Sequence, residues 1–247
     1  CRRMGKLLTA LAKHGVRRVL FSDSIGSFGE GSPREHATAR WLAENPGHDP
    51  GSAYGRQKRQ CRKLLKKFVA EDPTRRDARW AVIPGVLHTD ETWGDGTTEY
   101  ALEALKWAAR GGGPAFICPI PLDVKLPMIM REDLVEGLVS LTLATREQLQ
   151  EPAGGYAMAG FSFTPKELFE EMNRHFAQHP KQGRSSARLC IRAAVDSNSS
   201  PAGTFSRLWP DSLSHVEAQR DLGGFRSRQG LRDAIKAILE AWACRDA

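Results

Sequence analysis

The sequence predicts an α/β protein in which helices alternate with the strands of a parallel sheet. Apolar residues at helical spacing predict a helix over 5–14, and the apolar run at 16–22 predicts a buried strand directly after it. A second helix, over 53–70, precedes a second buried strand at 79–84. Because a helix between two strands carries the chain back to the edge where the next strand begins, this order favours a parallel sheet.

The second half of the chain is predicted to contain more helices and fewer strands. A short strand is predicted at 116–119, and a third strand of the sheet at 155–159. Thr164 is an expected N-cap for a helix over 165–176. Further helices are predicted over 98–110, 132–145 and 231–244. Residues 180–204 show no clear periodicity and are predicted to be mostly irregular.

The composition indicates a globular protein of 247 residues, with 40% hydrophobic and 26% charged residues. No apolar run approaches the roughly 20 residues that a membrane-spanning helix needs, so no membrane association is predicted. Five scattered cysteines without a CxxC pair favour a reducing compartment over a disulfide framework. The net charge of +7 suits an anionic ligand such as a dinucleotide, but it also suits nucleic acid.

Three polar side chains form the strongest candidate for chemistry. Tyr54 and Lys58 are four residues apart in the predicted helix, and an ammonium group one turn from a phenol favours the phenolate. Ser24 follows the first strand, at the carboxyl end where α/β active sites form. Taken alone, most YxxxK pairs are a surface tyrosine beside a surface lysine. With Ser24 on the substrate oxygen, Tyr54 would be the general base in the oxidation of an alcohol.

A series of sequence blocks around these residues resembles a known family. The serine strand with its loop (LFSDSIGSFGEGSPRE), the YxxxK helix (DPGSAYGRQK) and a strand ending in Pro-Gly (RWAVIPGVL) resemble extended short-chain dehydrogenases of the NAD-dependent epimerase/dehydratase superfamily. The later blocks GDGTTEYALEAL, DVKLPMIM, AGFSFTPKEL and WPDSLSHVEAQRDLG are similar to the L-threonine 3-dehydrogenase group. NDP-sugar epimerases share the first three blocks but do not usually carry the GDGTTEYA-like and SFTP-like ones.

The resemblance implies a partial Rossmann-like parallel sheet with a smaller C-terminal substrate-binding region. Residues 1–90 would be the C-terminal part of the NAD-binding region, and 91–247 would mainly bind substrate, with a strand near 155–159 returning to the sheet. The implied catalytic residues are Ser24, Tyr54 and Lys58. The implied NAD-binding residues are Tyr54, Lys58, Pro84, Gly85, Val86 and Leu87. The implied substrate-binding residues are Ser24, Thr97 and Thr98.

The threonine pair admits a second interpretation. A helix amino end at Thr97 and Thr98 would suit a substrate carboxylate, but either threonine would also serve as an ordinary N-cap. Without the resemblance, the residues themselves favour the cap.

The implied reaction is the oxidation of L-threonine by NAD to 2-amino-3-oxobutanoate, a step of threonine catabolism. The family forms homodimers through the helices at 5–14 and 53–70, and it occurs in bacterial cytoplasm and in mitochondria. Two alternatives stay open: an NDP-sugar epimerase or dehydratase of the same superfamily, and a non-catalytic remnant. No metal site is predicted, because His175 and His179 have no third ligand nearby. No nucleic-acid partner is predicted, because the basic residues of 56–67 go around their helix.

A glycine-rich phosphate-binding turn is missing from its expected place. A dinucleotide-binding fold should open with a strand, such a turn and a helix amino end, yet no GxGxxG or GxxGxxG follows a strand in this sequence. The resemblance implies that residue 1 lies inside the helix before the serine strand. We therefore expect residues 1–247 to bind NAD poorly, as a fragment of a longer protein or as a degenerate relative without full activity.

Overall fold

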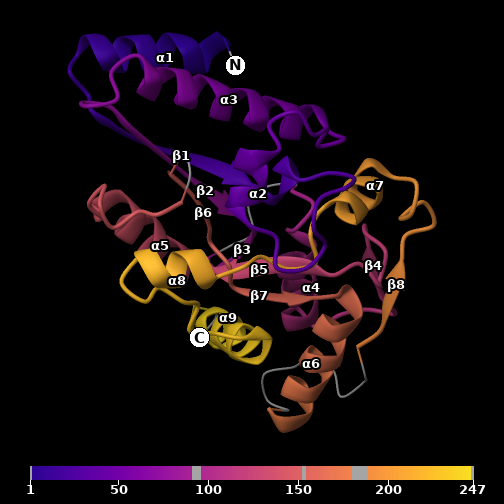
Figure 1. Cartoon of the computed structure of the whole chain (residues 1–247). Coiled ribbons are helices and arrows are strands. Elements are labelled where there is room, and N and C mark those ends of the chain that lie inside the picture. Colours follow the sequence, from indigo (N-terminus) through magenta and orange to yellow (C-terminus); the bar gives the residue numbers. More distant parts are fainter. Residues whose placement is uncertain (1, 91–95, 152–153, 180–188, 246–247) are drawn as a thin grey trace. The chain divides into compact units, whose positions relative to one another are not determined.

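The computed structural model describes residues 2–90, 96–151, 154–179 and 189–245 (Figure 1). The chain divides into two compact units, and each unit draws on three stretches of the sequence. The first unit comprises Cys1–Pro84, Val135–Ala159 and Leu208–Arg226. The second unit comprises Gly85–Leu134, Gly160–Arg207 and Ser227–Ala247. The division by function into 1–90 and 91–247 stays a prediction.

A three-stranded parallel sheet forms the centre of the first unit, in the strand order β1-β2-β6. Its strands are β1 (Arg18–Ser24), β2 (Asp77–Ile83) and β6 (Gly155–Ala157). The register places Ser24 opposite Ile83, so β1 and β2 end at the same carboxyl edge. The predicted α/β class with a parallel sheet is confirmed, and the predicted strands differ from the observed ones by one or two residues at their ends.

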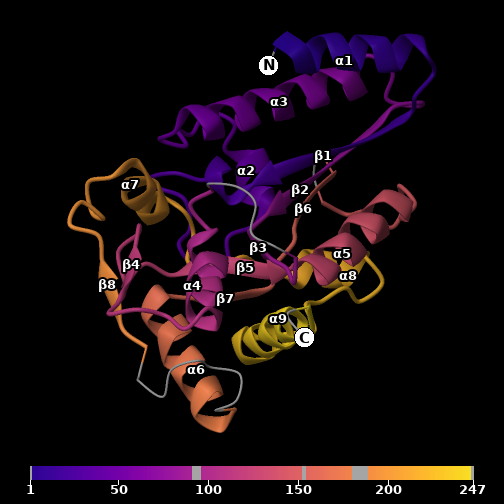
Figure 2. The same ribbon diagram turned by 180° about the vertical axis from the view of Figure 1, so that it is seen from behind.

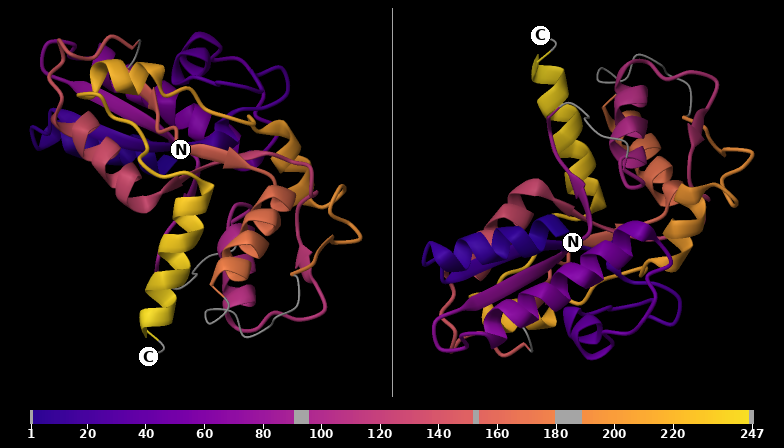
Figure 3. Two further views of the ribbon diagram at one scale, coloured as in Figure 1. Left: turned by 90° about the horizontal axis from the view of Figure 1, so that it is seen from below. Right: turned by 90° about the horizontal axis from the view of Figure 1, so that it is seen from above.

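Two long helices of the first unit lie side by side over one face of this sheet. Figure 3 shows them in the view from above: α1 (Arg2–Lys13) and α3 (Ala53–Ala70). Leu65 and Phe68 of α3 are buried in the same core as Trp80 of β2. Both helices are at the positions predicted from the sequence, and their buried apolar residues form the stripe that packs on the sheet.

The opposite face of the sheet carries a buried arginine. Figure 2 shows α5 (Arg131–Leu143) on the side of the sheet away from α1 and α3. Arg79 of β2 is fully buried, and its guanidinium donates to the carbonyl oxygens of Leu141 and Thr142 at the end of α5. Arg79 is also paired with Asp77 at 2.8 Å. The buried charge is therefore satisfied by a carboxylate and by the unpaired carbonyls of a helix carboxyl end.

Three short elements of the first unit were not predicted. They are η1 (Ile25–Ser27), α2 (Ala39–Glu44) and α8 (Val216–Asp221). The helices α2 and α8 both contact β6. A helix of six residues makes fewer than two turns, so its apolar residues show no recognisable period.

Two small sheets are found among the described residues of the second unit. The first has the order β3-β5-β7, with β3 (Gly85–Leu87) parallel to β5 (Leu126–Met130) and β5 antiparallel to β7 (Phe161–Phe163). The second pairs β4 (Phe116–Cys118) with β8 (Ile191–Ala193) in parallel.

Four helices of the second unit are described. They are α4 (Tyr100–Ala109), α6 (Pro165–Gln178), α7 (Pro201–Leu208) and α9 (Leu231–Arg245). The predicted cap of α6 is confirmed, because Thr164 and Glu167 form a reciprocal capping box. At the other end of α6, His179 is the C-cap, and its Nδ1 lies 3.0 Å from the carbonyl oxygen of His175.

The prediction that 180–204 is mostly irregular is wrong for part of that segment. Residues 180–188 lie outside the described residues, but β8 and the start of α7 fall within the rest. The strand exists because β4 pairs with it, which is a tertiary contact that local composition does not carry. Among the described residues, no helix has the length and apolar character needed to cross a bilayer.

Candidate active site

Ser24 is the last residue of β1, and its side chain faces the turn that follows. Its extended backbone makes it the N-cap of η1, and its Oγ accepts a hydrogen bond from the backbone N–H of Gly26 at 3.1 Å. That bond fixes the position of the hydroxyl oxygen and leaves the hydroxyl proton to donate elsewhere. The serine is thus held at the carboxyl edge of the sheet, with a donor still available for a substrate oxygen.

Tyr54 lies in the first turn of α3, directly against this serine turn. A Cβ atom at Gly26 would lie 3.1 Å from Cδ1 of Tyr54 and 3.6 Å from Oγ of Ser24. A Cβ atom at Gly55 would lie 2.1 Å from the carbonyl oxygen of Gly26. Any larger residue at Gly55 would push the start of α3, and Tyr54 with it, away from the turn. The Tyr54 side chain is 51% exposed, so solvent or a substrate can reach it.

Lys58 places its ammonium group beside the tyrosine ring. Its Nζ donates to the carbonyl oxygen of Ser22 at 2.6 Å and lies 5.2 Å from the centroid of the Tyr54 ring. The same Nζ atom lies 4.9 Å from the centroid of the Phe21 ring. Two aromatic rings and one carbonyl oxygen therefore hold the ammonium group in place. The structure therefore brings Ser24, Tyr54 and Lys58 together at one edge of the sheet. In this arrangement the phenolate form of Tyr54 can take a proton from an alcohol whose oxygen is held by the serine hydroxyl.

The residues predicted to border the nicotinamide directly follow β2. Ser24 is opposite Ile83 in the sheet, so the next residue, Pro84, lies at the same carboxyl edge as the serine. Pro84 is buried and ends the first unit, while Gly85, Val86 and Leu87 form β3 of the second unit. A Cβ atom at Gly85 would lie 2.1 Å from Sδ of Met128, so packing alone already requires glycine there. Cofactor contact by these four residues stays a prediction.

The threonine pair belongs to the second unit, and the cap interpretation of it is wrong. The N-cap of α4 is Glu99, whose side chain makes no capping hydrogen bond. Thr98 instead packs against Gly85, whose Cβ atom would lie 2.8 Å from the Cβ atom of Thr98. Thr97 and Thr98 are both half-buried, and their contact with a substrate stays a prediction.

The curated relatives carry two kinds of name. The chain is 29% identical to the mitochondrial L-threonine 3-dehydrogenase of Bos taurus over 169 residues, which are 68% of this chain and 42% of that protein. It is 28% identical to the Sus scrofa protein of the same name over 217 residues, or 88% of this chain and 52% of that protein. It is 24% identical to an uncharacterized epimerase/dehydratase of Staphylococcus haemolyticus over 241 residues, covering 96% of this chain and 68% of that protein. No family model matches the chain.

Its relatives and structural neighbours are L-threonine 3-dehydrogenases and epimerase/dehydratases. A partial consensus L-threonine 3-dehydrogenase matches with a TM-score of 0.80 at 23% identity, covering 98% of this chain and 70% of that one. The holo form of a GalE-like L-threonine dehydrogenase from Cupriavidus necator matches with a TM-score of 0.79 at 24% identity, covering 97% and 70%. MoeE5, in complex with UDP-glucuronic acid and NAD, matches with a TM-score of 0.71 at 18% identity, covering 99% and 70%.

These comparisons confirm the predicted resemblance and the Rossmann-like fold class. The chain spans about half the length of the two mammalian relatives, at 42% and 52%. The structural matches are all below 25% identity and therefore speak for the fold alone.

Sequence reasoning missed a buried ion pair behind the serine. Asp23 accepts hydrogen bonds from the backbone N–H of Ser24 at 2.9 Å and from Oγ of Ser27 at 2.5 Å, and it is paired with Arg62. The Asp23 side chain is 0% exposed and that of Arg62 is 8% exposed. A signal was present, because Arg62 is four residues after Lys58 and extends the same helix face toward the strand.

Proposed function

We propose that this chain carries the catalytic residues of an NAD-dependent short-chain dehydrogenase that oxidises the 3-hydroxyl of L-threonine to 2-amino-3-oxobutanoate. The observation that carries the proposal is the convergence of Ser24, Tyr54 and Lys58 at the carboxyl edge of a parallel sheet. The names of the mammalian relatives support the choice of L-threonine.

Each of the three side chains has a separate task in the proposed reaction. The Ser24 hydroxyl, held by the N–H of Gly26, donates a hydrogen bond to the substrate oxygen and orients it. The Tyr54 phenolate accepts the hydroxyl proton as the substrate carbonyl forms. The Lys58 ammonium, 5.2 Å from the tyrosine ring centroid, stabilises the phenolate.

The residues present fit the nicotinamide half of NAD. When bound, NAD supplies a hydride acceptor. Lys58 offers ammonium protons beyond the one given to Ser22, and Pro84 and Gly85 follow β2 at the same edge. The sequence contains no glycine-rich turn between a strand and a helix for the pyrophosphate. Residues 1–247 alone are therefore proposed to bind NAD weakly.

A second candidate is a nucleotide-sugar epimerase or dehydratase with the same catalytic residues. The match to the staphylococcal epimerase/dehydratase favours it, because that match covers 96% of this chain, against 88% for the Sus scrofa relative. The two candidates share the tyrosine chemistry and differ in the substrate that the second unit accepts.

The proposed protein is a homodimer that associates through α1 and α3. Leu7 of α1 is 51% exposed, which places an apolar side chain on the outer surface of this helix pair. Sedimentation of the wild type and of Leu7→Glu tests this: the wild type sediments as a dimer and the variant as a monomer. A monomeric wild type contradicts the dimer.

The decisive experiment measures NADH formation with L-threonine and, separately, conversion of UDP-glucose and UDP-glucuronic acid. It is run on residues 1–247 and on the product of any coding sequence that continues upstream of Cys1. Titration calorimetry with NAD is done on both. Tyr54→Phe is the matched control, because it removes one oxygen from an exposed side chain.

NADH formation that depends on L-threonine and is lost in Tyr54→Phe supports the proposal. Conversion of a UDP-sugar without NADH release overturns the substrate and favours the epimerase. Absence of NAD binding in every form overturns the enzyme and favours the non-catalytic remnant.

A further inference from the structure

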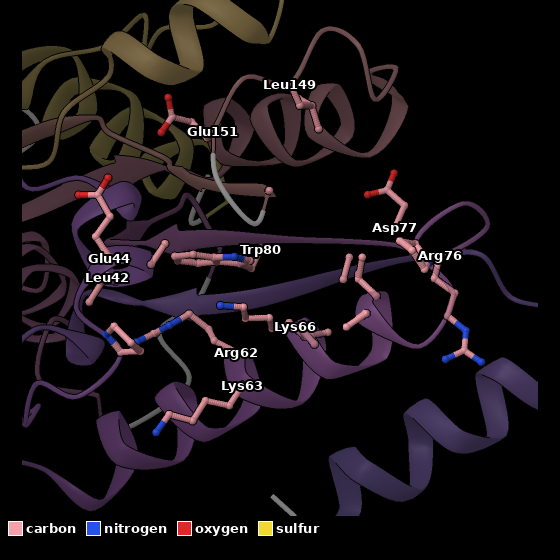
Figure 4. A pocket seen from close by; sticks show the side chains of 18 of the residues that line it. Leu42, Glu44, Arg62, Lys63, Lys66, Arg76, Asp77, Trp80, Leu149 and Glu151 are labelled. Atoms are coloured by element: carbon pink, nitrogen blue, oxygen red, sulfur yellow. The ribbon is translucent and has the colours of Figure 1, made fainter.

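A cavity of about 580 Å³ lies in the first unit, away from the candidate active site (Figure 4). Its walls come from the end of α2, from α3, from β2 and from the segment after α5. None of Ser24, Tyr54 and Lys58 lines it. Its volume falls within the range of pockets that hold small organic molecules.

The floor of this cavity is apolar. It is formed by the ring of Trp80 together with Leu65 and Val69 of α3 and Leu42 of α2. Trp80 and Leu65 are each only 2% exposed, so they are fixed by the core behind them. A rigid aromatic and aliphatic floor favours a ligand with an apolar body.

One side of the cavity is a row of cations on α3. The spacing i, i+3, i+4, i+7 places them on one face of the helix: Arg59, Arg62, Lys63 and Lys66. Basic residues lie all around α3, but this subset shares the cavity face. Figure 4 shows Arg62 and Lys66 extending between α3 and Trp80.

The carboxylates that line the cavity do not cancel this row. Asp77 is paired with Arg79 at 2.8 Å, and Glu151 is paired with Arg40 at 2.9 Å and with Arg220 at 2.8 Å. None of these three arginines lines the cavity. Glu44 also lines the cavity and is exposed, and in Figure 4 the carboxylates of Glu44, Asp77 and Glu151 point away from Trp80. The charge that faces a ligand is therefore positive.

Arg62, which lines the cavity, has a hydrogen-bond donor without an acceptor in the described part of the chain. Its side chain is 8% exposed, it is paired with Asp23, and its guanidinium lies 5.3 Å from the centroid of the Trp80 ring. Its Nη2 atom is buried and has no hydrogen-bond partner among the described residues. Buried donors of this kind nearly always have a hydrogen-bond acceptor, so we expect a ligand to supply one here.

We propose that this cavity binds an amphiphilic organic carboxylate. The carboxylate lies on Arg62 and Lys66, and its apolar body lies against Trp80 and Leu65. Both requirements are built into the walls: donors with a net positive charge on α3, and a rigid apolar floor beside them. None of Ser24, Tyr54 and Lys58 lines this site, and its assignment does not rest on the proposed dehydrogenase reaction.

The probe is decanoate, with decanol and decyltrimethylammonium as matched compounds of the same chain length. Binding to residues 1–247 is measured by titration calorimetry below micelle-forming concentrations. We expect decanoate to bind at least about tenfold more tightly than decanol, because only the anion pairs with the guanidinium. The cation is expected not to bind. Added salt is expected to weaken the binding of decanoate more than that of decanol.

Lys66→Met and Lys67→Met are a matched pair of variants. Both lysines are exposed on α3, but only Lys66 lines the cavity. Lys66→Met is expected to lower the affinity for decanoate about tenfold, and Lys67→Met is expected to leave that affinity unchanged. Ala70→Trp fills the cavity from an exposed position and is expected to abolish binding.

Arg62 is left intact in these variants, because its loss would leave the buried Asp23 carboxylate without its ion-pair partner. Equal binding of decanoate and decanol, with Lys66→Met like the wild type, would overturn the anion site. Failure of decanoate to bind, or its full binding to Ala70→Trp, would overturn the cavity as the site. NADH formation is not used as a readout, so failure here leaves the proposed function untouched.

Discussion

Asp23 and Asp221 are both buried carboxylates of the first unit that are held by arginine, yet their surroundings differ. Asp23 contacts the backbone of Ser24, the hydroxyl of Ser27 and the buried Arg62. Asp221 accepts from the hydroxyl of Tyr156 at 2.5 Å, from the backbone N–H of Gln150 at 2.9 Å and from Arg220 at 2.7 Å. The Asp221 partner Arg220 is 38% exposed, against 8% for Arg62.

The two clusters join different parts of the unit. The Asp23 cluster stays within the serine turn and α3, the elements that carry Ser24, Tyr54 and Lys58. The Asp221 cluster ties α8 to β6 through Tyr156, and it reaches α2 through the Glu151–Arg40 pair. A buried carboxylate paired with arginine therefore has two different roles in this unit. Asp23 fixes the geometry of the candidate active site, and Asp221 holds the helices on the sheet.

Tyr54→Phe should give the largest effect, and it tests the catalytic side of the comparison. In a form of the chain that turns over L-threonine, we expect turnover to fall about 100- to 10,000-fold, because the general base is removed. The unfolding temperature should stay unchanged, because Tyr54 is 51% exposed.

Tyr156→Phe is its matched control. It removes a buried hydroxyl from the Asp221 cluster, so it should lower the free energy of unfolding by about 2 kcal/mol and leave turnover per folded molecule unchanged. Equal loss of turnover in both variants would contradict the division between the clusters.

Asp221→Asn should mainly lower stability. We expect a loss of about 3 kcal/mol in the free energy of unfolding, measured by urea denaturation, because a buried charged acceptor with several donors is replaced by an amide. The KM and kcat of the folded protein should not change. A normal urea midpoint would mean that α8 is held by other contacts.

Asp23→Asn should lower turnover more than stability. The amide oxygen can still accept from Ser24, but the charge that orients Arg62 is lost, and the serine turn loosens. We expect kcat to fall about 10- to 100-fold with little change in KM, since a small displacement of a catalytic group has a large effect on rate. If kcat is preserved and only the urea midpoint falls, the Asp23 cluster has a structural role like that of the Asp221 cluster, and the proposed difference between the two clusters is wrong.

Acid should unfold the protein partly through the Asp221 cluster. Burial raises the pKa of Asp221, but hydrogen bonds from Arg220, Tyr156 and Gln150 outweigh it and lower the pKa to about 2 from an ordinary value of 3.8. Because the folded pKa is depressed, the stabilisation is fully present above about pH 4 and is lost as the pH falls toward 2. The urea midpoint of the wild type should therefore fall between about pH 4 and pH 2, and that of Asp221→Asn should fall less. Parallel curves for the two proteins would assign the acid effect to other carboxylates.

Local patterns in the sequence determined the long elements of the first unit, and the family resemblance selected the residues of the candidate active site among them. The start of α3 follows from the Ser52 cap, and the predicted range of about 53–70 agrees with the observed Ala53–Ala70. Tyr54 and Lys58 share a face because four residues make one helical turn, and Ser24 follows a strand whose apolar run is visible in the sequence.

Only the tertiary structure decided what these elements meet. The Asp23–Arg62 pair joins residues far apart in sequence, and it depends on how α3 lies across β1. The short strands β3, β5, β7 and β8 exist because a partner strand pairs with each of them, and Thr98 packs on Gly85 instead of capping α4. Periodicity and capping act over one or two turns, so they are readable in the sequence, whereas pairing between distant segments depends on the register in which those segments come together.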